Sequence, residues 1–173
     1  MLDQRRLKRL LDKLCECDEG KPLRAAYSCV EHAARVLAEH GVEPESRSLK
    51  TFKAVEAYIF ASGHEEDCFT AGVEAKEDSY NWERTDSFGR AIILFNRAAH
   101  YLAQAASDYN YYVTEQDNIL GAINDARLAA NMATEERFVG PEDIWQEKLI
   151  TKLVKQSHAN LDSPRLRASL LAG

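Results

Sequence analysis

The chain has 173 residues, of which 45% are hydrophobic and 29% are charged, with 28 acidic and 22 basic residues. These proportions are typical of a folded globular protein and exclude wholesale disorder. No stretch approaches the roughly 20 consecutive apolar residues of a membrane-spanning helix, so we expect no membrane insertion.

The net charge and the cysteines indicate the compartment and the partners. A formal charge of −6 is expected to repel nucleic acid and anionic membranes, although a local basic patch would override this field. A domain of this length does not need disulfides, and the leucines of the N-terminal stretch alternate with charges, unlike a secretory signal. We therefore expect a cytoplasmic protein whose cysteines, at positions 15, 17, 29 and 68, are reduced.

Helix-forming residues dominate the chain, and only eight glycines and four prolines interrupt them. No internal repeat, low-complexity tract or linker is present. The sequence therefore predicts one all-α domain spanning residues 1–173, a bundle of roughly six to eight helices.

Two amphipathic helices are expected at the start of the chain. Residues 3–17 place leucines on one face and mainly basic residues on the others, with Asp3 as the N-cap. Pro22 suits the first turn of a second helix, and Gly41 is placed to end it. The residues expected to face inward are Leu7, Leu10, Leu11, Leu14, Leu23, Ala26, Tyr27, Val30, Ala33, Ala34 and Leu37.

Two further helices with weaker patterns follow. Ser46 is expected to cap a third helix that stops at Gly63, and the acids after His64 suit the start of a short fourth helix. Residues 78–86 are mostly polar and predict a loop. The residues expected to face inward are Leu49, Phe52, Val55, Ile59, Cys68, Phe69 and Val73.

The stretch 87–106 is the one around which the rest of the chain is expected to be organised. Its apolar residues recur at spacings of three and four, and Ile93, Leu94 and Tyr101 widen the stripe beyond one face. A helix this apolar must be covered on several sides. We therefore expect residues 87–106 to form the central helix of the bundle.

The remaining helices complete the predicted bundle. Thr114 and Asp117 resemble a capping box in front of a helix whose outer side is expected to be rich in amides. Pro141 predicts another helix start, and Ser163 with Pro164 predicts a last short helix. The residues expected to face inward are Ile119, Ile123, Ala126, Ala130, Ala133, Trp145, Leu149, Ile150 and Leu153.

Metal binding and several types of catalysis find no support. None of the five histidines has a glutamate three residues before it, as dimetal carboxylate bundles require. Cys15 and Cys17 lack the second ligand pair of a structural zinc site, and no glycine-rich phosphate loop is present. We expect no metal, no cofactor and no assembled catalytic site.

Polar residues of the 87–106 helix form the candidate binding surface. Arg90, Arg97 and Gln104 recur at every seventh position, and His100 lies one turn from Arg97, so these four residues form a ridge. If this ridge is covered, its arginines must be paired with acids of a partner or of the segment 64–86. The tyrosines that follow the helix are of a type enriched at protein interfaces, and they are Tyr109, Tyr111 and Tyr112.

Arg35 and His40 suggest a different function. Their spacing resembles the Arg-x4-6-His motif of the HEPN family of helical-bundle ribonucleases, and the surrounding sequence AAYSCVEHAARVLAEHG is similar to the alanine-rich helices of that fold. The resemblance implies RNA cleavage, with His40 moving the 2′-hydroxyl proton and Arg35 stabilising the phosphate charge. A cation at the C-terminus of a helix is the structural alternative for His40.

The sequence thus favours a non-enzymatic cytosolic domain that binds another protein, or a second copy of itself, as an adaptor, regulator or inhibitor. The alternative is the HEPN-like ribonuclease. Nucleic-acid binding through the basic first helix and Lys148, Lys152 and Lys155 is disfavoured by the net charge.

Overall fold

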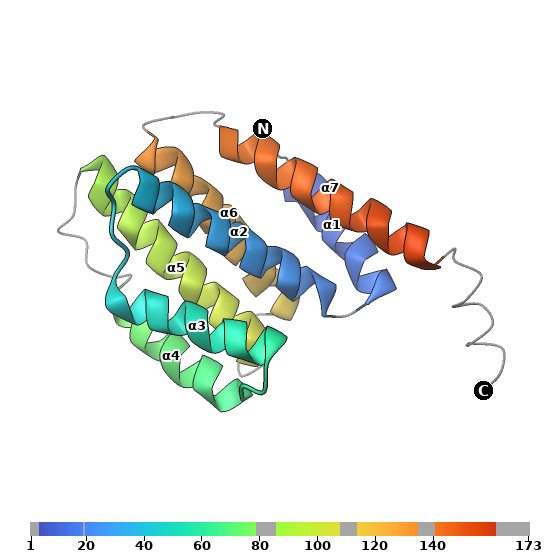
Figure 1. Ribbon diagram of the computed structural model, residues 1–173, viewed down its shortest axis with the longest axis horizontal. Helices are drawn as coiled ribbons and strands as arrows, with labels where there is room; N and C mark the ends of the chain where they lie inside the picture. Colours follow the sequence, from blue (N-terminus) through green and yellow to red (C-terminus); the bar gives the residue numbers. More distant parts are fainter. Residues whose placement is uncertain (1–3, 19, 79–85, 108–113, 135–140, 162–173) are drawn as a thin grey trace.

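The computed structural model describes residues 4–18, 20–78, 86–107, 114–134 and 141–161 (Figure 1). Within these ranges the chain forms seven α-helices and no strand, which confirms the predicted all-α bundle. The helices are α1 (Gln4–Cys17), α2 (Lys21–Glu39), α3 (Ser46–Phe60), α4 (Glu65–Asp78), α5 (Ser87–Ser107), α6 (Glu115–Ala133) and α7 (Pro141–Leu161).

The helices are arranged as a centre with a helix pair on each side. Helices α2, α5 and α6 pack against one another at the centre. The antiparallel pair α3 and α4 covers α5 on one side, and α1 and α7 lie next to each other beyond α2 and α6 on the other (Figure 1). One hydrophobic core cluster draws side chains from all seven helices.

Helix α5 is the central helix, as its apolar sequence predicts. It packs on α2, α3, α4 and α6, and Phe95, Leu102 and six of its alanines are among its buried residues. Alanines allow neighbouring helix backbones to approach closely, because they fill little space between them. The close packing around α5 therefore follows from its composition.

Helix ends follow the expected local chemistry in most places. Gly41 has φ +72°, a left-handed conformation that favours glycine, immediately after the C-cap residue of α2. The Thr114 hydroxyl accepts a hydrogen bond from the backbone N–H of Asp117 at 3.1 Å and caps α6. Ser46, however, is the first residue of α3, and Glu45 occupies the N-cap position.

The inward faces of α3 and α4 follow the prediction only in part: Cys68 is buried, and Phe52 and Ile59 pack partly buried against the core. Leu49, Phe69 and Val73 are exposed, whereas the predicted inward position Val55 is buried. Small and polar residues are buried beside Val55, because some of their partners are hydrogen-bonding groups: Ser48 bonds to α5 and Thr51 to α4. The buried residues of α3 and of the described part of α4 are Ser48, Thr51, Val55, Cys68, Gly72 and Ala75.

Helix α6 buries both its apolar stripe and several polar residues. The predicted inward residues Ile119, Ile123, Ala126, Ala130 and Ala133 are all buried. The expectation of an amide-rich outer side is wrong for two amides, which lie inside, together with one acid, because other helices cover α6 on more than one side. These buried polar residues are Asn118, Asp125 and Asn131.

Helix α7 is held against α2 by an aromatic stack. The rings of His32 and Trp145 lie with their centroids 3.7 Å apart and their planes within 9° of parallel. Ile150 is fully buried, and the side-chain amide of Gln146 donates a hydrogen bond to the Ile123 carbonyl at 3.3 Å. Burial lowers the pKa of His32, so the stack favours the neutral imidazole.

We predict a pH-dependent gain in stability for His32→Phe, which retains a ring but cannot be protonated. Because the folded-state pKa of His32 is lowered, its contribution to stability is present above the unfolded value of 6.5 and is lost as pH falls below it. Urea unfolding between pH 7.5 and pH 5 should therefore show the variant gaining stability relative to wild type. His64→Phe, at an exposed position, is the control, and an equal gain there would contradict the prediction.

The structure describes the connections between the helices only in part. The predicted loop 78–86, apart from its two ends, and the predicted last helix after Ser163 lie outside the described residues. None of the described helices combines the length and apolar character needed to cross a bilayer.

Candidate functional site

The polar residues of α5 do not share one environment. Arg90 is exposed near the start of the helix, Arg97 is partly exposed, and His100 is buried. Arg97 and His100 are both bound to neighbouring helices. Of these three predicted binding residues, Arg90 is therefore the one fully available at the surface.

Arg97 pairs with a residue that the sequence analysis did not single out. Its Nε lies 3.1 Å from Oδ2 of Asp125 on α6, and the Asp125 side chain is only 5% exposed. Burial raises the pKa of Asp125 to about 6, and the neighbouring guanidinium opposes this shift. Arg97 is thus paired within the bundle, by α6 rather than by an acid of the segment 64–86.

A sequence signal for Asp125 is present, although it is easily missed. Asp125 follows Ala122 by three residues and precedes Ala129 by four, so it lies in phase with the buried stripe of α6. A charged residue at such a position requires a partner of opposite charge on the facing helix. Arg97 is the partner that meets this requirement.

We predict that Asp125→Asn becomes more stable relative to wild type as pH rises. Because the folded-state pKa of Asp125 is raised, its favourable contribution is present below the unfolded value of 3.8 and is lost as pH rises through about 6. The difference in unfolding free energy, measured by urea titration, should shift towards the variant by about 1–3 kcal/mol between pH 4 and pH 7. Asp67→Asn, at an exposed position of α4, is the matched control. If the difference in unfolding free energy between Asp125→Asn and wild type did not change with pH, the prediction would be refuted.

A second set of polar contacts joins α3, α4 and α5. The Ser48 hydroxyl donates to Oδ1 of Asn96 at 2.7 Å, and the Thr51 hydroxyl donates to the Ala71 carbonyl at 2.8 Å. Nδ1 of His100 lies 2.9 Å from the Gly72 carbonyl oxygen, which can only accept, so Nδ1 carries the proton. Burial lowers the pKa of His100, which keeps this imidazole neutral.

Gly72 allows α4 to approach α5 closely enough for these contacts. A Cβ added at Gly72 would lie 2.9 Å from the Cβ of Ala103, which cannot rotate away. The close approach therefore depends on the missing side chain at Gly72.

We predict that Gly72→Ala destabilises the protein despite the better helix propensity of alanine. Alanine gains about 1 kcal/mol in propensity, but the clash with Ala103 costs about 1–3 kcal/mol, so a net loss of about 1 kcal/mol is expected in urea unfolding. Adding Ala103→Gly should reduce the cost of the Gly72→Ala step, measured in a double-mutant cycle. Additive effects of the two substitutions would contradict a direct contact.

Arg35 and His40 are both engaged with their own helix. Nη2 of Arg35 lies 2.9 Å from Oε2 of Glu31, one turn earlier in α2. His40 is the C-cap residue of α2, and its Nδ1 lies 2.9 Å from the Val36 carbonyl oxygen. These contacts fit the role of a polar group that completes the end of a helix.

The cysteines and other possible metal ligands do not converge in the described residues. None of Cys15, Cys17, Cys29 and Cys68 is joined in a disulfide. Burial raises the pKa of Cys68 to about 11, which keeps it as an unreactive thiol at neutral pH. No group of three or more metal-ligating side chains is found among the residues that the structure describes.

Large apolar side chains are exposed on α3, on α4 and in the first turn of α5. Phe60 is 62% exposed at the end of α3, where it makes an edge contact with Tyr27, and Phe88 is 45% exposed at the start of α5. Within the described ranges, every exposed large hydrophobic residue belongs to α3, α4 or the first turn of α5. We call these residues the α3–α4 surface, and they are Leu49, Phe60, Phe69, Val73 and Phe88.

Arg90 lies two residues after Phe88, at the exposed start of α5. The other predicted binding residues, Tyr109, Tyr111 and Tyr112, lie outside the described residues. Sequence reasoning missed the α3–α4 surface because it assigned Leu49, Phe69 and Val73 to the core.

Comparison with protein-family models, with curated proteins and with solved structures finds no match for this chain.

Proposed function

We propose that the protein is a non-enzymatic, cytosolic helical domain that binds another protein through the α3–α4 surface. The observation that carries this proposal is the gathering of all the exposed large hydrophobic residues of the described chain on α3, α4 and the start of α5. Large apolar side chains left in water favour association, because contact with a partner removes them from solvent.

The composition of α4 supports the same role. Its inward residues are small, so its attachment to the bundle depends on close approach and on hydrogen bonds to backbone carbonyls. Its larger apolar residues, Phe69 and Val73, are four positions apart and face outward on one side of the helix. This arrangement is typical of a helix that offers an apolar stripe to a partner.

The four cysteines, none of which is joined in a disulfide, support a reducing compartment. A homodimer formed through the α3–α4 surface is the form of this proposal in which the partner is a second copy of the chain.

We predict that Phe69→Ser combined with Val73→Ser weakens binding of the partner protein. The tagged protein would be captured from the lysate of its own host, after nuclease treatment, and the associated proteins quantified. A stoichiometric protein should accompany wild type, and its affinity should fall at least about tenfold in the double variant, as expected when central apolar residues of an interface are lost. The matched control on the same helix is Glu66→Ser with Thr70→Ser, which removes exposed side chains but little apolar area.

Equal capture by the two double variants would reject the α3–α4 surface. Because Phe69 and Val73 keep part of their area buried, Phe69→Ser with Val73→Ser is expected to lower the unfolding temperature, and circular dichroism would verify that both double variants are folded at the assay temperature.

RNA cleavage by Arg35 and His40 is the alternative that this experiment also separates. If this alternative is correct, capture without nuclease should recover RNA but no specific protein. The protein should also cleave RNA, and His40→Ala should abolish that cleavage. Cleavage retained by His40→Ala would remove this alternative.

A further inference from the structure

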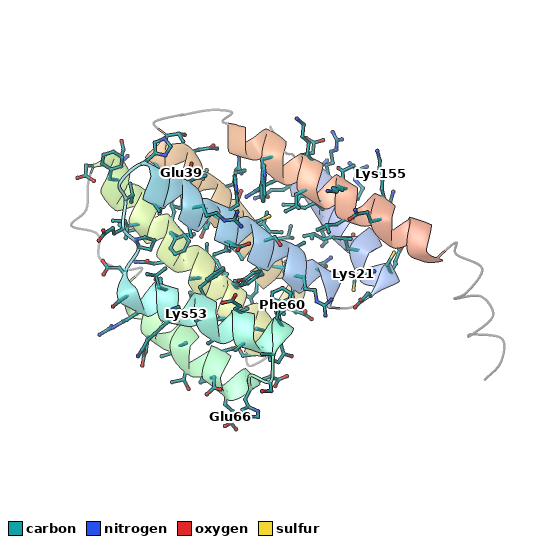
Figure 2. The ribbon with its side chains drawn as sticks, in the orientation of Figure 1. Lys21, Glu39, Lys53, Phe60, Glu66 and Lys155 are labelled. Atoms are coloured by element: carbon teal, nitrogen blue, oxygen red, sulfur yellow. The ribbon has the colours of Figure 1, made fainter. Side chains whose placement is uncertain are left out.

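Basic side chains gather on α1 and α7, although the protein as a whole is acidic. Helix α1 carries five basic residues against two acidic ones, and most of the basic residues are exposed. On α7, Lys148, Lys152 and Lys155 are all exposed, and their spacing of four and three residues places them on one side of the helix. Figure 2 shows Lys155 extending from α7 away from the bundle.

A shallow hollow joins the two helices at this point. It has a volume of about 610 Å³ and is lined by Arg6 of α1 and by the three lysines of α7, together with Thr151 and Gln156. We call it the basic hollow. Its uncharged side chains, Thr151 and Gln156, can donate hydrogen bonds beside the charged groups.

The positive charge of the basic hollow is largely uncompensated. Glu147, the one acid that lines it, is paired with Arg6 at 2.5 Å. Among the described residues no ion pair is found for Lys148, Lys152 or Lys155. Three unpaired ammonium groups within about 11 Å along one helix repel one another and favour a ligand with matching negative charges.

We infer that the basic hollow binds an acidic segment of a partner protein, in the form of a helix with carboxylates spaced to match the lysines. Along α7, the lysines follow one another at about 6 Å and about 4.5 Å, which is the spacing that acidic residues four and three apart present on a facing helix. The alkyl stems of the lysines supply apolar contact beside the charges.

A short acidic segment fits better than a nucleic acid. The hollow is small, and the whole protein carries a charge of −6, so the protein as a whole repels a long polyanion. A segment of a few helical turns would cover only the basic region.

The basic hollow is a second surface, distinct from the α3–α4 surface. Helices α2, α5 and α6 separate the two, which lie on opposite sides of the bundle (Figure 1). The inference rests on the proposed function only in that the occupant is a protein. Because different side chains form the two surfaces, Phe69→Ser with Val73→Ser should leave the basic hollow intact, so the two proposals fail independently.

The test measures binding of a fluorescein-labelled helical peptide of about 18 residues, with glutamates at spacings of four and three along one face, by anisotropy in about 50 mM NaCl. Wild type should bind the peptide, and Lys148→Glu, Lys152→Glu and Lys155→Glu together should weaken binding at least about tenfold. Lys21→Glu, Arg24→Glu and Lys53→Glu together form the matched control, because they make the same change in net charge away from the hollow. The control should bind within about threefold of wild type.

A shuffled peptide of the same composition, with its glutamates spread around the helix, should bind wild type more weakly than the patterned peptide. Equal weakening by the two triple variants, or equal binding of the two peptides, would overturn the inference in favour of non-specific attraction. Tighter binding of poly(U) RNA or of phosphatidylserine vesicles than of the peptide would overturn it in favour of those ligands. Self-association of the protein at low salt that the lysine variant abolishes would identify a second copy as the occupant and would also overturn it.

Discussion

The burial of α5 on several sides is the constraint on which the rest of the bundle depends. A helix surrounded in this way has few positions at which a polar side chain can reach water, so each buried polar group must find a partner on a neighbouring helix. Asn96 bonds to α3, His100 to α4 and Arg97 to α6. These contacts set the positions of three neighbouring helices along α5, which apolar packing alone would leave less strictly defined.

Residue spacing predicts the part of the fold that apolar burial determines. The central helix, the capping of α6 by Thr114 and the end of α2 near Gly41 all follow from local sequence patterns. The inward faces of α3 and α4 follow only in part, because Ser48 and Thr51 are buried there against a side-chain amide and a carbonyl of other helices. A pattern of leucine and phenylalanine points away from the bundle at these helices, and only the tertiary arrangement reveals that Ser48, Thr51 and Gly72 face inward.

The candidate sites, like the inward faces of α3 and α4, depend on tertiary structure. The sequence identifies Arg97 as a side chain that needs an acid, but it does not identify Asp125, since that residue lies among the alanines of another helix. The α3–α4 surface is invisible to periodicity, which treats every large apolar residue as core. The lysines of α7 are visible in the sequence, whereas their position beside Arg6 depends on the packing of α1 against α7.

The pairing of α1 with α7 has a consequence for the order in which the protein acquires its surfaces. Arg6 and Glu147 belong to the first and the last helices of the described chain, so during synthesis the hollow between them forms only after all the intervening helices have emerged. Helices α3, α4 and α5, by contrast, are contiguous in sequence and can pack as soon as α5 is made. A nascent chain would therefore complete the packing of α3 and α4 on α5 before the hollow between α1 and α7 exists.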